Sequence, residues 1–425
     1  MQYTKKDLGS YQLHLIKTDK YKTITIKVMF RRRIKKEEVT IRNILTSLLV
    51  QSTKKYNTKR KMNIEAQELY SSSIAFDNTR LGNYINTTIS LNVLNDKYTE
   101  KGNFNKALEF LNEVLFNPDV EEGKFKEKNV DIIKTREKTE LQGLKENLGA
   151  YTAVRSLESF DKNSPVSIRM IGYLEYLDSI DGKSLYEYYL DMINKDNVEI
   201  SVIGNIDESE IVKEIKKYFK LRILKKQSTN ISLPLKKHRA RRLFAKETVD
   251  ANQTNVNMIC TVDKLTDYER KYVLPLYNVI LGGGPDSKLF KIVREKNSLC
   301  YFISSRYKAL DNILVIRTGI NRKNYSKTLK LTEKVMNMMK KGKFENEDLK
   351  TAKEFFETSY DQIEENPNAV INMYLAMEYL GLDDIDTRRK MTNKVTKNEI
   401  IKVAKKIHMD TVFTLEGDKD EEKDI

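Results

Sequence analysis

The chain has 425 residues, of which 40% are hydrophobic and 32% are charged, so it is long enough for two or three domains with sizeable cores. No stretch approaches the roughly 18 consecutive apolar residues of a membrane-spanning helix, and the N-terminal MQYTKKDLGSYQLHL lacks the apolar core of a secretory signal. Two cysteines, Cys260 and Cys300, exclude a disulfide framework and a multi-cysteine zinc site. We therefore expect a cytoplasmic protein.

The net charge of +15 comes from 76 Lys and Arg residues against 61 Asp and Glu residues. A basic chain can bind nucleic acid, an acidic surface or an acidic substrate. Most of these residues are lysines dispersed along the whole sequence rather than gathered in one stretch. We therefore expect neither a nucleic-acid partner nor a membrane partner.

The N-terminal part of the chain alternates strand and helix patterns. The run Phe30–Lys36, FRRRIKK, follows a predicted strand, and we expect its arginines to be solvated. The expected strands are Tyr11–Lys17, Thr23–Phe30, Ser73–Asp77, Tyr84–Val93 and Val198–Ile203, and the expected helices are Glu37–Gln51, Asn63–Ser71 and Glu208–Phe219, with a largely helical region from Phe104 to Ile193.

The same pattern occurs twice. Gly204 ends one strand pattern and Gly417 ends another 213 residues later, and helical runs begin near Asn105 and Ser326, which are 221 residues apart. Residues 220–246 contain ten Lys or Arg, no Asp or Glu, and Pro234, which indicates an extended linker. We predict an α+β fold with duplicated halves at 1–222 and 247–425, joined by a basic linker at 223–246. Each half is an antiparallel sheet with packed helices, and the two form a clam-like cavity.

The three histidines, His14, His238 and His408, are far apart in sequence, and no H-x-x-x-H or H-x-x-E-H pair occurs. A helix-borne zinc site from this chain alone therefore has no ligands. His14 lies at an alternating position of a predicted strand, which favours a buried, hydrogen-bonded role. A site built from histidines on separate elements stays open as an alternative.

One stretch of the second half stands out, LGGGPDSKLFKIVREKNSLCYFISSRY. Gly282, Gly283 and Gly284 permit positive φ and close approach of another backbone. Arg294 lies in the last turn of a predicted helix, and Tyr301 begins the next strand. A guanidinium and a phenol brought together can stabilise an oxyanion. From the residues alone, helix capping by Arg294 and packing of Tyr301 at the edge of the core is the favoured interpretation.

This stretch resembles the second-half signature of the pitrilysin/insulinase-type zinc peptidases, which carry a Gly-rich turn and an R-E-K-x-x-L-A-Y core. The resemblance extends over nearly the full chain, through the duplicated halves and the segment DNVEISVIGNID that closes the first half. It implies that Arg294, Tyr301 and the glycines Gly282, Gly283 and Gly284 bind substrate.

The zinc motif of that family is missing. Its members carry H-x-x-E-H on the first helix, where this chain has Asn43 and Ser47 in place of the histidines and Thr46 in place of the glutamate base. At the expected position of the third ligand, a glutamate, the chain has Lys134. Asn and Ser are weak zinc ligands, and Thr does not accept a proton from bound water near neutral pH. We therefore expect this chain to bind no metal and to have no catalytic residues of its own.

The chain is similar in length and pattern to the YmfF-type bacterial members of the family, which lack the zinc motif. The resemblance implies the non-catalytic subunit of a heterodimeric peptidase, with zinc in a paralogous partner and a peptide or unfolded polypeptide as substrate. We expect the strand Gln253–Val262 to pair with substrate by β-addition. A non-proteolytic binding or assembly protein on the same fold is the alternative, and a homodimer without metal also stays open.

Overall fold

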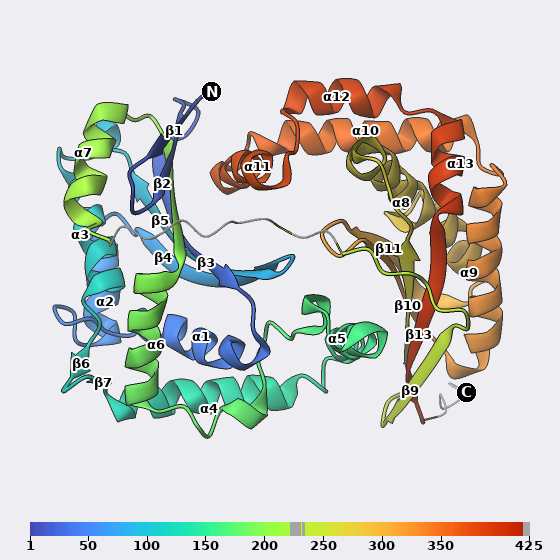
Figure 1. Ribbon diagram of the computed structural model, residues 1–425, viewed down its shortest axis with the longest axis horizontal. Helices are drawn as coiled ribbons and strands as arrows, with labels where there is room; N and C mark the ends of the chain where they lie inside the picture. Colours follow the sequence, from blue (N-terminus) through green and yellow to red (C-terminus); the bar gives the residue numbers. More distant parts are fainter. Residues whose placement is uncertain (222–230, 232–233, 420–425) are drawn as a thin grey trace, which may run out of the picture. The chain divides into compact units, whose positions relative to one another are not determined.

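The structure of the protein is a computed structural model that describes residues 1–221, 231 and 234–419 (Figure 1). Residues 223–230 and 232–233 of the predicted linker lie outside this description. The chain forms two compact units. Unit 1 comprises Met1–Gly143, Arg169–Asn230 and Glu364–Leu375, and unit 2 comprises Leu144–Ile168, Ile231–Ile363 and Ala376–Ile425. Segments from within the predicted first half therefore contribute to unit 2, and a short segment of the second half contributes to unit 1.

Unit 1 contains a six-stranded sheet in the order β1-β2-β8-β3-β5-β4, in which only the pairing of β2 with β8 is parallel. The central strand β3 buries alternate apolar residues such as Ile24, Ile26 and Val28 in the main core of the unit. The strands are β1 (Gln2–Asp7), β2 (Gln12–Lys17), β3 (Thr23–Arg33), β4 (Ser73–Leu81), β5 (Tyr84–Leu94) and β8 (Asn197–Gly204), with a separate hairpin of β6 (Val120–Glu121) and β7 (Lys124–Phe125).

Three helices of unit 1, α2, α6 and α7, begin at side-chain caps. The α6 helix starts in a reciprocal capping box between Asp181 and Ser184, and the Asp207 side chain accepts a hydrogen bond at the start of α7. The helices of unit 1 are α1 (Lys36–Leu49), α2 (Lys59–Glu68), α3 (Asn103–Phe116), α4 (Glu127–Gly143), α6 (Gly182–Lys195) and α7 (Glu208–Tyr218), with short 3₁₀ turns at Asp96–Tyr98 and Leu174–Tyr176.

Unit 2 contains a five-stranded sheet in the order β11-β12-β10-β13-β9, covered by helices on both faces (Figure 1). In the central strand β10, Met258 and Cys260 belong to the main core of the unit, whereas Ile259 packs with Phe160 of α5 on the opposite face. The strands are β9 (Leu243–Val249), β10 (Thr254–Val262), β11 (Cys300–Lys308), β12 (Ile313–Ile320) and β13 (Ile407–Gly417).

The helices associated with unit 2 come from three parts of the chain. The α11 helix is shared, because its first nine residues belong to unit 1. These helices are α5 (Leu148–Asp161), α8 (Leu274–Gly282), α9 (Tyr325–Lys340), α10 (Asn346–Ile363), α11 (Pro367–Leu380), α12 (Ile385–Lys394) and α13 (Lys397–Lys405), with π-helical turns at Glu269–Val273 and Phe290–Glu295 and 3₁₀ turns at Pro165–Ser167 and Arg322–Asn324. No helix in the described residues is long and apolar enough to cross a membrane.

The strand connections confirm the predicted α+β fold and its duplication. In unit 1 the order β2-β8-β3-β5-β4 has the same pattern of parallel and antiparallel pairs as β9-β13-β10-β12-β11 in unit 2. Gly204 and Gly417, paired by sequence alone, end the equivalent strands β8 and β13. Each sheet is mainly antiparallel with one parallel pair, which the sequence did not indicate.

The prediction that the arginines after Phe30 are solvated is wrong for Arg31 and Arg32, whereas Arg33 is exposed. Strand β3 continues to Arg33, Arg31 is only 2% exposed, and its Nε donates to Asn86 at 2.9 Å. Arg32 forms ion pairs with Glu38, Asp191 and Asp196. A charge pattern along the sequence did not reveal these partners, because they come from α1 and from the end of α6.

A buried ion pair ties α1 to the sheet. The Arg42 and Asp196 side chains are both fully buried, and the Arg42 guanidinium binds Asp196 and the Thr87 hydroxyl and donates to Tyr188 at 3.2 Å. Asp196 also binds Arg32, so its carboxylate has two cationic partners. A buried charge is tolerated when its hydrogen-bonding groups are satisfied in this way.

Replacing Arg42 by Met should therefore destabilise unit 1 strongly. The substitution leaves the Asp196 carboxylate buried beside a single cation, and we expect a loss of about 3–5 kcal/mol in the free energy of unfolding. Urea denaturation followed by circular dichroism measures it. The matched control is Lys36→Met on the same helix, whose ion pair with Glu175 is exposed and should contribute less than about 1 kcal/mol. Equal losses in the two variants would contradict the assigned role of Arg42.

The same cluster should make stability depend on pH. Burial raises the pKa of Glu38, but hydrogen bonds and charge from Lys35 and Arg32 outweigh burial and hold the pKa below its usual value. The unfolded state then binds a proton more readily than the folded state, so this stabilisation is present above about pH 4.3 and is lost as the pH falls through the folded-state pKa. Denaturation of wild type and Glu38→Gln at about pH 6 and about pH 3.5 should show a smaller drop in the variant. An equal drop in both proteins would exclude this role for Glu38.

Candidate functional site

The positions of the missing zinc motif lie on α1 and are occupied by hydrogen bonds within the protein. The Asn43 side-chain Nδ2 donates to the Met170 carbonyl at 2.9 Å, and its Oδ1 accepts from Asn78 Nδ2 at 3.0 Å. Asn78 lies on the edge strand β4 and accepts a bond of 2.6 Å from Thr87, the residue that also contacts Arg42. A continuous network therefore joins Asn43 to the buried ion pair.

Thr46 and Ser47 on α1 and Lys134 on α4, which occupy the other three expected zinc-site positions, also form hydrogen bonds within the protein. The Thr46 hydroxyl lies 3.1 Å from the Arg42 carbonyl oxygen and also accepts from Asn78 at 3.0 Å. The Ser47 hydroxyl accepts from Arg136 at 2.8 Å, and Lys134 Nζ donates to the Ile180 carbonyl at 2.6 Å.

These residues do not fit a zinc ion. Zinc in proteins is bound by thiolate, imidazole or carboxylate groups, and this set offers an amide, two hydroxyls and a lysine. The Asn43 oxygen is already bonded to Asn78, and Arg136 together with Lys134 brings positive charge to two of the positions. The chemistry of the donor set therefore agrees with the sequence prediction that this helix holds no catalytic metal.

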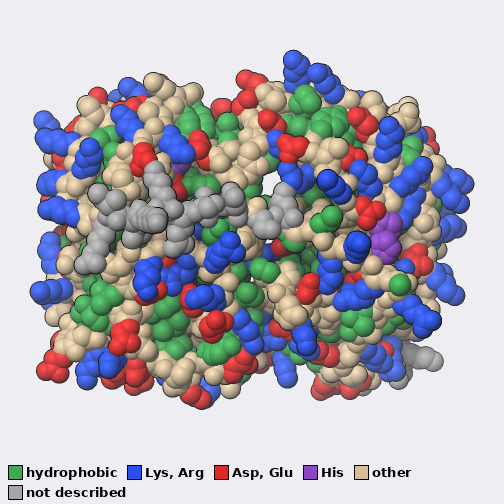
Figure 2. Space-filling view, viewed as in Figure 1, with side chains coloured by type: hydrophobic (Ala, Val, Ile, Leu, Met, Phe, Trp, Pro, Cys, Tyr) green, Lys and Arg blue, Asp and Glu red, His purple; other side chains and the backbone are tan. Residues whose placement is uncertain are grey.

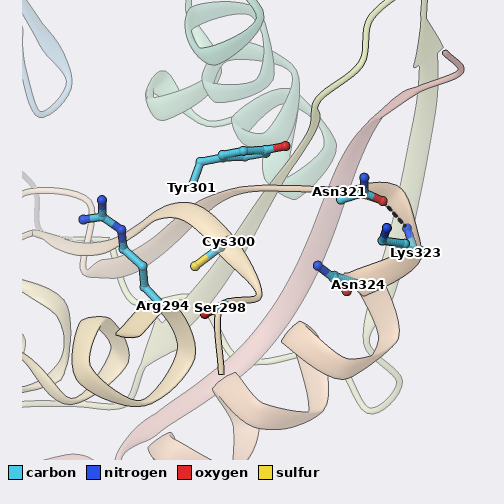
Figure 3. Close-up of a pocket in the computed structure, with 7 residues that line it drawn as sticks. All are labelled: Arg294, Ser298, Cys300, Tyr301, Asn321, Lys323 and Asn324. Atoms are coloured by element: carbon cyan, nitrogen blue, oxygen red, sulfur yellow. Dashed lines mark hydrogen bonds between the residues drawn. The ribbon is translucent and has the colours of Figure 1, made fainter. Parts of the chain in front are cut away.

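Arg294 and Tyr301 line one pocket of about 380 Å³ in unit 2 (Figure 3). The lining residues are Arg294, Ser298, Cys300, Tyr301, Asn321, Lys323 and Asn324. Two of them are cationic and none is acidic. The structure thus places the two predicted substrate-binding side chains on one wall, together with asparagines that the sequence interpretation missed.

Local backbone structure explains the exposure of Tyr301. The pairing of β11 with β12 shifts by one residue between Cys300 and Phe302, which leaves Tyr301 at a β-bulge with its side chain 54% exposed. Bulges of this kind redirect a side chain away from the regular alternation of a strand. A Cβ atom added at Gly319 of β12 would lie 2.5 Å from Cε1 of Phe302 on β11. Glycine at this position therefore leaves room for the Phe302 ring.

Arg294 lies in the π-helical turn that precedes β11. Its guanidinium carbon is 4.6 Å from the centroid of the Phe290 ring, within cation–π range, and the side chain is exposed. Figure 3 shows the guanidinium of Arg294 and the hydroxyl of Tyr301 pointing in different directions. To donate to one acceptor, the long Arg294 side chain must rotate, which its exposure permits.

Cys300 also lines this pocket. Burial raises its pKa, although a hydrogen bond with Thr318 lowers it in part. A raised thiol pKa reduces the thiolate fraction and with it the nucleophilicity of the cysteine.

The three glycines lie at the C-terminal end of α8 and none of them lines this pocket. An added Cβ at Gly282 would lie 2.7 Å from the Ser305 backbone nitrogen, so glycine allows α8 to approach β11 closely. The sequence suggested that these glycines permit a positive φ or a close approach of another backbone. None of the three has a positive φ, so the first of these roles is excluded. Around Gly284 an added Cβ would meet nothing within 4 Å.

Strand β10 is not available for β-addition, contrary to expectation. Every residue of the pairing segment Thr254–Thr261 is opposite a β12 residue, and β13 pairs along the other side. The edges of this sheet are β11 and β9. An added peptide strand therefore has its place at an edge, and β11 is the edge that carries Tyr301.

Comparison with known proteins agrees with this arrangement. Residues 179–356 match the Peptidase M16 inactive domain. Over 419 residues the chain is 28% identical to "Probable inactive metalloprotease YmfF" of Bacillus subtilis, with 96% of each chain covered. The chain therefore resembles the inactive, YmfF-like type of M16 peptidase over nearly its whole length, in agreement with the resemblance noted in the sequence.

Two further proteins are similar to this chain. The crystal structure of a conserved protein from Enterococcus faecalis matches with a TM-score of 0.91 and 27% identity, covering 99% of this chain and 100% of that one. "Uncharacterized zinc protease YmxG" of Bacillus subtilis is 29% identical over 196 residues, which are 45% of this chain and 46% of the relative. Relatives described as zinc proteases therefore exist beside the inactive type.

The hydrogen-bonding partners at the former zinc positions were not found from the sequence. Asn78, Met170 and Arg136 lie 35, 127 and 89 residues from the α1 residues that they contact. Asn321 and Asn324 follow β12, and their proximity to Tyr301 depends on the pairing of β11 with β12. An alignment of the strands of the two halves could have indicated that Asn321 and Asn324 lie near Tyr301.

The contact of α8 with β11 gives a direct test of the glycine assignment. Gly282→Ala should destabilise unit 2 by about 1–3 kcal/mol, because the new methyl group meets the Ser305 backbone. Gly284→Ala is the matched control and should change stability by less than about 0.5 kcal/mol, since its surroundings are open. Thermal and urea unfolding of both variants measures the difference, and a neutral Gly282→Ala would disprove the close approach.

Proposed function

We propose that the chain is the non-catalytic subunit of a heterodimeric zinc peptidase in the cytoplasm. A paralogous partner carries the zinc ion, and this chain supplies a wall that binds a peptide or unfolded polypeptide. The observation that carries the proposal is a contrast between two sites. Internal hydrogen bonds occupy Asn43, Thr46 and Ser47, whereas Arg294 and Tyr301 are exposed beside an open pocket.

The chemistry of the pocket suits a peptide carbonyl. When water attacks a peptide bond, negative charge develops on the carbonyl oxygen, and fixed donors that face this oxygen lower the barrier. In the proposed complex the Arg294 guanidinium and the Tyr301 hydroxyl donate to this oxygen. Lys323 adds positive charge on the same wall, and the amides of Asn321 and Asn324 offer further donors for a peptide backbone.

The substrate itself is held by the backbone of the sheet edge. An extended peptide adds a strand to β11, whose other side pairs with β12. The open surroundings of Gly284 let a peptide backbone come close to the end of α8. Recognition through main-chain groups suits an unfolded polypeptide of varied sequence.

Two relatives in one organism support a partnership. Bacillus subtilis contains both the full-length inactive relative and a relative described as a zinc protease. The proposal gives the two types complementary roles, with zinc on one chain and the Arg294–Tyr301 wall on the other. It assigns no nucleic-acid or membrane partner, since Lys and Arg side chains are scattered among Asp and Glu over the face shown in Figure 2.

Arg294→Ala tests this role in the reconstituted pair. The chain is co-expressed with an intact zinc peptidase of the family from the same organism, and hydrolysis of a fluorogenic peptide library is measured. We expect the variant to lower kcat/KM about 10²–10³-fold, the loss seen when one oxyanion donor is removed, while the pair still forms. Tyr301→Phe keeps the ring and should lower the rate through loss of the hydroxyl alone.

Lys350→Ala is the control, because Lys350 is an exposed cation on α10 of the same unit and lies outside both the pocket and strand β11. Its turnover should equal that of wild type. A pair that forms with unchanged turnover in Arg294→Ala would refute the catalytic contribution. Assembly without any zinc-dependent hydrolysis would instead support a binding or assembly protein built on this fold.

A further inference from the structure

Two of the three histidines come together in unit 2 although they are 170 residues apart in sequence. One ligand atom each from His238, Asp263 and His408 lies within 4.8 Å of the other two. The histidine rings stack with their centroids 4.4 Å apart, and His408 Nε2 is 2.9 Å from Asp263 Oδ2. Histidine side chains (purple) are visible on the surface in Figure 2.

The sheet fixes two of these three residues. His408 is the second residue of β13 and is opposite Thr261 of β10. Asp263 directly follows β10, and its backbone N–H donates to the Lys406 carbonyl at 2.9 Å. Their positions are therefore set by paired backbone rather than by a loop.

The third residue is anchored on both sides. Lys236 Nζ lies 2.9 Å from Asp161 and donates to the Phe160 carbonyl at 3.0 Å. On the other side, the Arg239 backbone N–H donates to the buried Asp410 carboxylate at 2.7 Å, and its guanidinium binds the same carboxylate. These contacts hold His238 beside β13, because Asp410 lies on that strand two residues from His408.

We propose that His238, Asp263 and His408 bind a divalent transition-metal ion of the zinc type on the surface of unit 2. Two imidazoles and a carboxylate are a usual donor set for zinc, nickel or copper, whereas magnesium and calcium prefer oxygen ligands. In a tetrahedral zinc site neighbouring ligand atoms are about 3.3 Å apart, so the existing 2.9 Å pair needs only a small shift. An imidazole nitrogen that binds a metal ion carries no proton.

The surroundings permit the ion to enter. The side chains of His408 and Asp263 are 30% and 50% exposed, and His238 is exposed, so water can complete the coordination. The adjacent cations Lys236 and Arg239 are paired with Asp161 and Asp410, which offsets their charge. The bound ion would join the segment before β9 to the ends of β10 and β13.

This site is independent of the zinc motif on α1 and of the proposed heterodimer, because all three ligands belong to unit 2. Its test therefore uses the purified chain alone. Metal content in the reconstituted pair is compared in a His238→Ala background, so that zinc at this site is not mistaken for zinc in the partner.

The chain is prepared without an affinity tag, stripped with EDTA and titrated with Zn²⁺ by isothermal calorimetry. We expect one Zn²⁺ per chain, no binding of Mg²⁺, and a higher melting temperature with zinc. His238→Ala and His408→Gln should each weaken zinc binding at least about tenfold and abolish the rise in melting temperature. Asp286→Asn, an exposed carboxylate of the same unit paired with Lys291, is the matched control and should bind as wild type does.

Melting temperatures measured in EDTA check that the variants are folded. Because the side chains of His238 and His408 reach solvent, we expect the fold to tolerate both substitutions. Absence of zinc binding to the wild-type chain overturns the proposal. Binding that is equally strong in His238→Ala also overturns it, because the metal would then be held elsewhere.

Discussion

The fully buried ion pair of Arg42 and Asp196 is the constraint on which the rest of unit 1 depends. A guanidinium without contact to solvent must have its donors satisfied, and Arg42 achieves this with Asp196, Thr87 and Tyr188. Asp196 lies between α6 and β8, Thr87 belongs to β5, and Tyr188 belongs to α6. The helix that carries the former zinc positions is therefore fixed relative to the sheet by charge as well as by its apolar face.

The same constraint shapes the surface of α1. Thr87 contacts Arg42 and donates to Asn78, and Asn78 in turn donates to Asn43 and Thr46. The polar side chains at the former zinc positions thus continue a network that begins in the core. In unit 2 the equivalent edge strand, β11, has a bulge and exposes Tyr301 instead. Unit 1 thus has a polar network on α1, and unit 2 has a pocket beside the start of β11.

Sequence patterns predicted the features that depend on local order. The alternation in Thr23–Phe30, the helical spacing in Glu37–Gln51 and the register of Gly204 with Gly417 each correspond to an observed element. Features that depend on pairing between distant segments were missed, including strand β1 and the burial of Arg31. Arg294 and Tyr301 were found as a pair because they lie seven residues apart. The partners of Asn43 and the meeting of His238 with His408 required the sheet register, which periodicity does not contain.

The network around Asn43 also bears on how such a chain can change over time. Restoring histidine at positions 43 and 47 and acidic residues at 46 and 134 would remove the acceptor of Asn78 and the donor to the Met170 carbonyl. It would also leave Arg136 and the Ile180 carbonyl without their present partners. A single substitution toward the zinc motif therefore supplies no complete set of zinc ligands and removes hydrogen bonds that are present now. Zinc binding on this helix would require several substitutions at once.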